Sequence, residues 1–426
     1  MRVRGLARRL GAFLGSLAVT LVAAELMVGR YLPVNGVIYA VDDELLHDAL
    51  PRARRIQAMP PGAVRAGDAA RVWIETNSRG FRGPELESRS GRPRLLVLGD
   101  SYVMAENVPY EATFVRRLDL EFAARRVNEE AHGGGGDDPE LRRAGSARGI
   151  ECVNAGRSGY GPDQALLLAR RCIDDVAPDA VLLVLCAAND LGDLARNKLF
   201  RRAPDGRLIQ QRARLAPHIL RDFAERRDRA LQPALRRLWA FGRERRAHTA
   251  WPPPADPSLL SLYDELLTAQ HREHFIDGDL TVGWLFEDIY DSVQALAPQG
   301  RVARDEVALL TAILRALDGL TRARGVPFGV VITPAAPDLV PGLLVTITPE
   351  SHPGYQRGTL PALHREAAVA AGVRVIDVSQ VMAAYADPSA LFVGGDDPHW
   401  NATGQALAAR AVAAELVTWP ELRQDD

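Results

Sequence analysis

The sequence predicts an α/β fold in which a parallel sheet is covered by helices on both faces. Short and almost continuously apolar runs alternate with longer stretches of helical spacing, which is the pattern of a parallel sheet. The length of 426 residues suits one large domain with insertions. Runs of this kind are typical of strands buried on both faces. They lie at residues 94–99, 150–154, 180–187, 327–333 and 373–378.

The stretches between these runs have the apolar spacing of amphipathic helices. In residues 111–126, for example, Phe114, Leu118 and Phe122 recur at intervals of four, which places them on one face of a helix. The other helices are expected at residues 163–175, 303–324, 360–371 and 401–417.

The connection between the third and fourth runs is about 140 residues long, far more than a simple crossover needs. We therefore predict a helical insertion at about residues 197–291 within a domain that spans residues 94–420. The insertion is rich in arginine. A solvated helix face is the simpler interpretation of that charge, and a basic surface for anionic glycans or lipid headgroups is the alternative.

The N-terminus predicts a membrane segment. Arginines precede an apolar run over residues 10–24, which short apolar groups extend to residue 28. This length and the basic flank predict a signal anchor over residues 1–30, with the rest of the chain periplasmic or extracellular. A cleaved signal peptide is the alternative. Residues 31–93 have no sustained period and are expected to form a membrane-proximal lead-in.

Composition excludes several classes of partner and site. The net charge of −2 gives no electrostatic basis for binding nucleic acid, so none is expected as a partner. Three cysteines provide no disulfide framework, and no Cys/His spacing suggests a structural zinc site.

Four segments, each following a predicted strand or preceding the last helix, carry the groups that acyl transfer needs. That chemistry requires a nucleophile, a base, an orienting acid and donors for an oxyanion. In an open α/β sheet such groups gather at the carboxyl ends of the strands. The segments are Gly99-Asp100-Ser101, Asn154-Ala155-Gly156-Arg157-Ser158-Gly159, Ala187-Ala188-Asn189-Asp190 and Asp396-Asp397-Pro398-His399.

Each segment also has a purely structural interpretation. Serine and glycine are common in turns, and Asn189 is also a suitable N-cap for a helix. An Asp or Asn before the last helix could likewise serve as a cap. Against this, an Asp shortly before His399 can hold the imidazole in the tautomer that a base requires.

The four segments together resemble the SGNH (GDSL-like) hydrolase family, which is named for Ser, Gly, Asn and His in four ordered blocks. Residues 99–101 are similar to its Gly-Asp-Ser block, and Gly159 follows Asn154 by five residues as in its second block. Residues 187–190 and 396–399 are similar to its Gly-x-Asn-Asp and Asp-x-x-His blocks. One difference is Ala187, which stands where the family usually has glycine and places a methyl group beside the expected oxyanion site.

The resemblance implies a flavodoxin-like three-layer α/β/α sandwich with a five-stranded parallel sheet. It also implies Ser101 as nucleophile, His399 as base and Asp396 as its orienting acid, with Asp397 ranked second. The oxyanion would be bound by the backbone N–H groups of Ser101 and Gly159 and by the Asn189 side chain. Asp100 and Asp190 are expected to support the site. Neither a cofactor nor a metal is implied.

The expected function is that of a serine esterase that hydrolyses or transfers O-acyl groups through an acyl-enzyme on Ser101. The motif Asn77-Ser78-Arg79-Gly80-Phe81-Arg82 and the apolar N-terminus resemble a bacterial membrane-anchored subset of the family. By analogy, the substrate is expected to be an acylated, in particular acetylated, carbohydrate or cell-envelope polysaccharide. A lipase or lysophospholipase and a non-catalytic glycan-binding or assembly protein are the alternatives.

Overall fold

The computed structural model describes residues 11–17, 19–20, 23, 38–58, 71–88, 92–132, 149–212, 291–343, 355–394 and 397–422. Its centre is a five-stranded sheet with the order β11-β10-β7-β5-β6, and every neighbouring pair is parallel. All residues of β5, β7 and β10 are buried, as expected of strands covered on both faces. The strands are β5 (Arg94–Leu98), β6 (Glu151–Asn154), β7 (Ala180–Leu185), β10 (Phe328–Ile332) and β11 (Arg374–Asp377).

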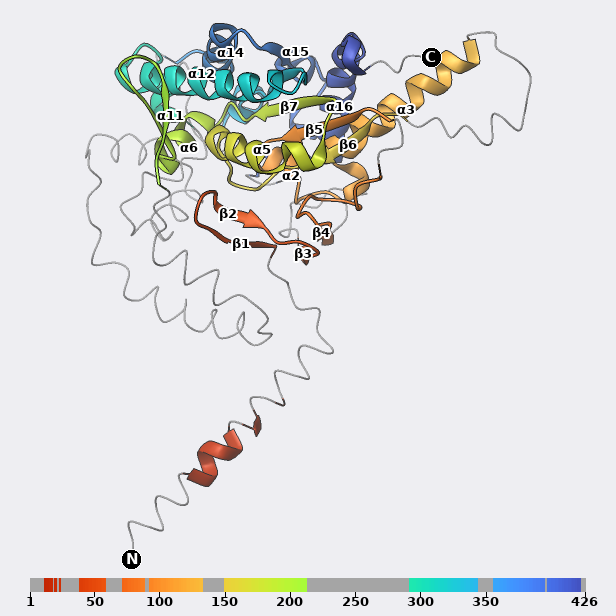
Figure 1. Ribbon diagram of the computed structural model, residues 1–426, viewed down its shortest axis with the longest axis vertical. Helices are drawn as coiled ribbons and strands as arrows, with labels where there is room; N and C mark the ends of the chain where they lie inside the picture. Colours follow the sequence, from red (N-terminus) through yellow and green to blue (C-terminus); the bar gives the residue numbers. More distant parts are fainter. Residues whose placement is uncertain are drawn as a thin grey trace, which may run out of the picture.

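Helices cover both faces of this sheet. On one face, α3 (Phe114–His132) packs against α16 (Ala402–Leu416). On the other, α12 (Arg301–Arg322) packs between α5 (Pro162–Val176) and α14 (Thr359–Ala371), as right-handed crossovers require. Figure 1 shows α12 and α14 side by side above the sheet. The predicted three-layer α/β/α fold with a five-stranded parallel sheet is confirmed.

The strand order fixes where a ligand can bind. The first strand of the sheet, β5, lies between β6 and β7, so the chain leaves it toward one edge and later continues toward the other. At such a reversal, the carboxyl ends of the two adjacent strands, here β5 and β7, form a crevice. Open α/β sheets bind ligands in this crevice. Here those ends lead into α2 (Ser101–Met104) and α6 (Asp190–Asn197), the two helices that begin at predicted site motifs.

Part of the predicted lead-in is folded against this domain. Strands β1 (Tyr39–Asp42) and β2 (Leu46–Ala49) form an antiparallel hairpin, and β3 (Arg54–Ala58) pairs with β4 (Arg71–Glu75). Figure 1 shows both pairs on the same side of the molecule, next to α2. The Arg82 N–H donates to the carbonyl of Asn154 at the end of β6, which joins this segment to the sheet.

The end of the predicted insertion contacts α6, the helix at whose end the insertion begins. Beyond α6 the chain forms a small hairpin of β8 (Phe200–Arg202) and β9 (Leu208–Gln210), and residues 213–290 lie outside the described part. Where the description resumes, Asp291 accepts hydrogen bonds from the N–H groups of Leu191 and Gly192 in α6. The shorter helices are α11 (Ser292–Leu296), α13 (Ala336–Leu339), α15 (Ser379–Ala383), η1 (Tyr110–Ala112), η3 (Pro388–Leu391) and η4 (Pro420–Leu422).

Most of residues 1–30, where the sequence predicts a signal anchor, lie outside the described residues. Within the described ranges, no helix has both the length and the apolar character needed to cross a membrane.

Candidate active site

The turn after β5 presents Ser101 at the start of α2. Gly99 has a φ of +154°, and a Cβ there would lie 2.5 Å from a methyl carbon of Val103, so the turn requires glycine. Asp100 is the N-cap, and its carboxylate accepts the N–H of Tyr102 at 2.9 Å. The cap and the glycine together fix Ser101 as the first helical residue.

Ser101, His399 and Asp397 form a continuous hydrogen-bonded chain, although Ser101 and His399 are 298 positions apart. The Ser101 hydroxyl lies 2.8 Å from Nε2 of His399, and Nδ1 of the same ring lies 2.6 Å from a carboxylate oxygen of Asp397. With Nδ1–H donating to Asp397, Nε2 is left to accept the serine proton. This is the arrangement that lets a histidine act as the base for a serine nucleophile.

The carboxylate beside His399 belongs to Asp397, the residue ranked second from the sequence. Its Oδ1 accepts both the ring Nδ1–H and the backbone N–H of His399, the latter at 2.9 Å, and Asn107 donates to Oδ2 at 3.3 Å. An Asp side chain readily accepts a backbone N–H two residues on, so the turn over Pro398 places it against the ring. Asp397 thus makes the contact that the sequence assigned to Asp396, and Asp396 itself lies outside the described residues.

The loop that carries His399 is held by neighbours on both sides. The Tyr102 hydroxyl donates to the carbonyl of Pro398 at 2.7 Å, which ties the loop to α2. The carbonyl of His399 accepts the N–H of Val393 at 2.9 Å. Asn401 caps α16 by accepting two backbone N–H groups of its first turn. The cap that the sequence also allowed is thus present, two residues beyond the histidine.

A cavity of about 360 Å³ brings the predicted site residues together: Ser101, Gly159, Asn189 and His399 all line it. Asn189 occupies the N-cap position of α6, but its side chain makes no capping hydrogen bond. Its Oδ1 is buried without a hydrogen-bond partner in the described part of the chain. The capping interpretation therefore does not explain this side chain, which lines the same cavity as Ser101.

The Ala187 methyl group is accommodated by the core. The residue is fully buried in the main apolar cluster, and its φ is not positive, so its backbone does not require glycine. The described residues that line the cavity include its neighbours Cys186, Ala188 and Asn189 but not Ala187. The Ala187 methyl group is therefore not part of the cavity wall.

Charges around His399 favour its protonated form. Burial alone would lower the pKa of the imidazole, but the carboxylates of Asp397, Asp100 and Glu106 outweigh it and raise the pKa above its ordinary value of 6.5. Burial likewise opposes ionisation of Asp397. The His399 charge and hydrogen bonds, with that from Asn107, nevertheless keep its pKa below the usual range. Asp397 is therefore ionised and able to stabilise an imidazolium.

The two supporting aspartates lie beneath the site. Asp190 accepts the N–H of Cys186 at 2.8 Å, which joins the end of β7 to α6, as Asp100 joins β5 to α2. Burial raises the pKa of both carboxyls, and the charges of Asp100 and Asp193 raise that of Asp190 further. Both are structural supports for the loops that carry Ser101 and Asn189.

The cavity also contains residues that the sequence did not single out. Glu106, Asn107, Gln57 and Ser158 line it. One oxygen of Glu106 accepts the hydroxyls of Ser158 at 2.8 Å and Tyr39 at 3.1 Å, while the other pairs with Arg55 at 3.2 Å. Ser158 lies inside the second motif, so its neighbourhood was visible in the sequence. Gln57 comes from the segment without periodicity, where no pattern marked it.

Part of the chain matches a model of a known protein family. Residues 281–426 match a family model described as "SGNH hydrolase-like domain, acetyltransferase AlgX". No curated protein matches the chain. Among solved structures, a lipase/acylhydrolase from Enterococcus faecalis is 11% identical, with a TM-score of 0.35 over 78% of this chain and 99% of that one.

An acetyl xylan esterase from Geobacillus stearothermophilus is 14% identical, with a TM-score of 0.32 over 76% of this chain and 94% of that one. A GDSL-like lipase from Bacteroides thetaiotaomicron is 10% identical, with a TM-score of 0.31 over 79% and 92% of the two chains. The matched residues include the motif at residues 396–399, and the other three motifs precede them in the sequence. Residues 281–426, which include His399, therefore resemble the SGNH hydrolase-like domain of that family model.

Proposed function

We propose that this protein is a serine esterase that hydrolyses or transfers O-acyl groups through an acyl-enzyme on Ser101. One observation carries the proposal: the chain of hydrogen bonds from Ser101 through His399 to Asp397, at 2.8 and 2.6 Å. A nucleophile, a base and an orienting carboxylate within hydrogen-bond reach are the requirements for activating a serine. Their position in a cavity gives an ester access to the hydroxyl.

In the first half of the reaction, Oγ of Ser101 attacks the ester carbonyl carbon while its proton passes to Nε2 of His399. The resulting oxyanion is bound by the backbone N–H groups of Ser101 and Gly159 and by the Asn189 amide. Removing one such donor from an acyl-transfer enzyme typically costs a factor of about 10²–10³ in rate. Collapse of the tetrahedral intermediate breaks the bond to the alcohol, which leaves with the proton from His399.

In the second half, water or a sugar hydroxyl attacks the acyl-enzyme. His399 now takes the proton of this acceptor and returns it to Oγ as the acyl–serine bond breaks. With water the products are a carboxylic acid and free enzyme, and with a hydroxyl the product is a new ester. The identity of the acceptor therefore separates hydrolysis from transfer on the same residues.

The lining of the cavity favours an uncharged, hydroxyl-rich substrate. The described lining residues carry amides and a hydroxyl at Gln57, Asn107, Ser158 and Asn189. They also include three carboxylates but no Lys or Arg. Carboxylates accept hydrogen bonds from sugar hydroxyls and repel phosphate groups. This supports an acylated carbohydrate rather than a lysophospholipid. The family model's description as an acetyltransferase supports acetyl as the acyl group.

The N-terminal sequence supports a location for this activity outside the cytoplasm. The basic residues before the apolar run over residues 10–24 support a membrane anchor, with the acyl-transfer domain in the periplasm or outside the cell. An anchored position would suit esters of a cell-envelope polysaccharide.

The test compares hydrolysis of 4-nitrophenyl acetate and 4-nitrophenyl octanoate by the full-length protein in detergent and by its Ser101→Ala variant. We expect the acetate to be preferred and the variant to lose almost all turnover. Equal rates for variant and wild type would contradict the assignment of Ser101. Addition of a methyl glycoside with analysis of its acetylation then measures transfer against hydrolysis.

A further inference from the structure

The peptide group between Ser158 and Gly159 is held from outside the predicted domain. Its N–H, on Gly159, is one of the proposed oxyanion donors, and its carbonyl oxygen, on Ser158, lies 2.9 Å from Nε2 of His47 in β2. The described peptide bonds are all trans. In a trans peptide, the C=O and the N–H point in opposite directions. A hydrogen bond that fixes the carbonyl therefore also fixes the direction of the Gly159 N–H.

The preceding peptide group is held by the same hairpin. The Ser158 N–H donates to the Tyr39 hydroxyl at 2.9 Å, and that hydroxyl donates to Glu106 at 3.1 Å. Thus both peptide groups that flank Ser158 are bonded to side chains of β1 or β2.

The backbone conformation of Gly159 makes its orientation sensitive to these hydrogen bonds of Ser158. Its φ is +77°, a conformation that glycine adopts without strain. A glycine has no side chain through which the core could hold it, and it is also the residue with the widest choice of backbone conformations. The hydrogen bonds of Ser158 therefore restrict the orientation of the Gly159 N–H.

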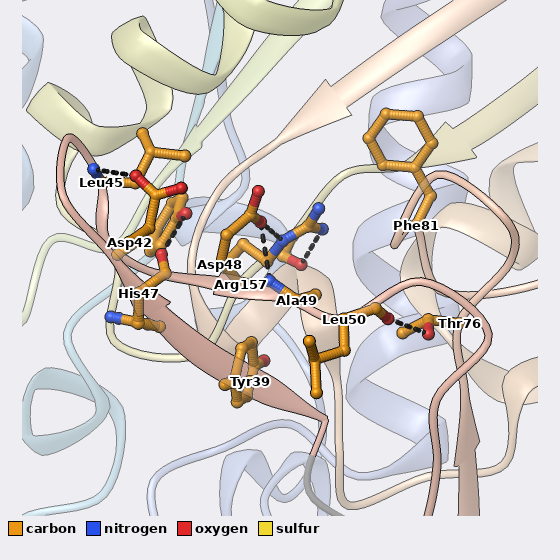
Figure 2. A network of polar contacts seen from close by, with 12 residues as sticks. Tyr39, Asp42, Leu45, His47, Asp48, Ala49, Leu50, Thr76, Phe81 and Arg157 are labelled. Atoms are coloured by element: carbon orange, nitrogen blue, oxygen red, sulfur yellow. Dashed lines mark hydrogen bonds and ion pairs between the residues drawn. The ribbon is translucent and has the colours of Figure 1, made fainter. Parts of the chain in front are cut away.

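The His47 ring is itself fixed in place. It packs edge-on against Tyr39 and Tyr160, with ring centroids 5.4 and 5.0 Å away. The Tyr160 hydroxyl donates to the His47 carbonyl at 2.7 Å. Next to it, Asp48 pairs at 2.8 Å with the fully buried guanidinium of Arg157, and Figure 2 shows these two side chains facing each other beside His47.

We propose that His47 is a positioning residue for the acyl transfer described above: its Nε2–H holds the Ser158–Gly159 peptide so that the Gly159 N–H faces the cavity. The hydrogen bond also polarises the peptide, because a bonded carbonyl makes the N–H of the same amide a stronger donor. The β1–β2 hairpin thereby completes the oxyanion site, although it lies more than 100 positions from it in the sequence. The inference rests on the proposed esterase function.

The test uses two substitutions at His47. His47→Phe keeps a ring between the two tyrosines but removes the donor, whereas His47→Gln keeps an N–H donor at a similar reach. With 4-nitrophenyl acetate we expect His47→Phe to lower kcat about 10- to 100-fold, somewhat less than outright loss of an oxyanion donor. KM should change less than about twofold, because an oxyanion contact acts in the transition state. His47→Gln should recover most of kcat.

The matched control is Arg171→Ala. Arg171 lies on α5 and ties the same hairpin to it through Asp42 at 2.7 Å, Glu44 at 3.1 Å and, more distantly, Asp48 at 3.4 Å. The closer partner of Asp48 is Arg157, at 2.8 Å, so this pair remains when Arg171 is removed. We expect this variant to lose thermal stability and keep its kcat.

Three results would overturn the inference: an unchanged kcat in His47→Phe, an equal loss in Arg171→Ala, or no recovery in His47→Gln. Each assumes an active wild type that depends on Ser101. If wild type and Ser101→Ala hydrolyse the ester equally, the proposed function itself fails, and this distinguishes the two failures.

Discussion

The two loops that carry the acid–base and oxyanion groups are stabilised in different ways. The His399 loop combines local contacts, through Asp397, Val393 and the Asn401 cap, with the distant Tyr102 hydroxyl that donates to Pro398. The Gly159 loop is held by His47, Tyr39 and Asp48, all more than 100 positions away. The first arrangement leaves a motif in the sequence, whereas the second joins residues that no local pattern connects.

The largest effect is expected at the His399 loop, from Asp397→Asn. The asparagine no longer stabilises the imidazolium or enforces the tautomer that leaves Nε2 free to accept the serine proton. Such a substitution in a serine–histidine–aspartate site lowers kcat by about 10⁴. Steady-state hydrolysis of 4-nitrophenyl acetate measures it, with Asp396→Asn as the neighbouring control. A larger loss in Asp396→Asn than in Asp397→Asn would return the orienting role to Asp396.

At the Gly159 loop, we expect the next largest effect in the free energy of unfolding, from Asp48→Ala. Asp48→Ala removes the carboxylate that pairs with Arg157, whose side chain is fully buried. Leaving a buried charge without its partner typically costs about 3–5 kcal/mol in the free energy of unfolding. The exposed pair of Arg374 and Glu421, at 3.1 Å, provides a control in Glu421→Ala, for which we expect less than about 1 kcal/mol. Denaturant unfolding of both variants measures the free energies of unfolding. Equal losses would show that the Asp48–Arg157 pair stabilises the fold no more than an exposed ion pair does.

The smallest expected effect is a shift in the pH profile of kcat/KM, caused by Glu106, which interacts with both loops. Because His399 acts as a base only when neutral, kcat/KM should rise with pH through the His399 pKa, which lies above 6.5, and then level off. Glu106 helps to raise that pKa and also accepts the Ser158 hydroxyl. Glu106→Gln removes the charge but keeps an acceptor oxygen, so the acid limb should move to lower pH by less than one unit. Movement to higher pH would contradict this account of the charges.

The sequence identified the sheet and most of the site because both leave local signals. The five apolar runs coincide with β5, β6, β7, β10 and β11. Three of the four motifs follow strand ends and the fourth precedes α16, and Ser101, Gly159, Asn189 and His399 line one cavity. The carboxyl ends of parallel strands lie at the same edge of a sheet, so motifs that follow such strands are expected to lie close together.

The rest depended on geometry that composition and spacing do not encode. Asp396 and Asp397 are adjacent and chemically identical, and only the turn over Pro398 determines which of them meets the ring. The strands of the hairpin that carries His47 have four residues each and no apolar alternation. His47 and Tyr39 act on main-chain atoms of Ser158, and a bond to the backbone places no constraint on the partner's residue type.

The central claim is that His399 and Asp397 activate Ser101, and covalent labelling tests it most directly. The full-length protein is incubated with an alkyl fluorophosphonate, which reacts with activated serines, and the labelled peptide is identified by mass spectrometry. We expect one phosphonyl group on Ser101 in the wild type, and no label in Ser101→Ala or His399→Ala. A wild-type protein that stays unlabelled, or a label that persists in Ser101→Ala, would contradict the account.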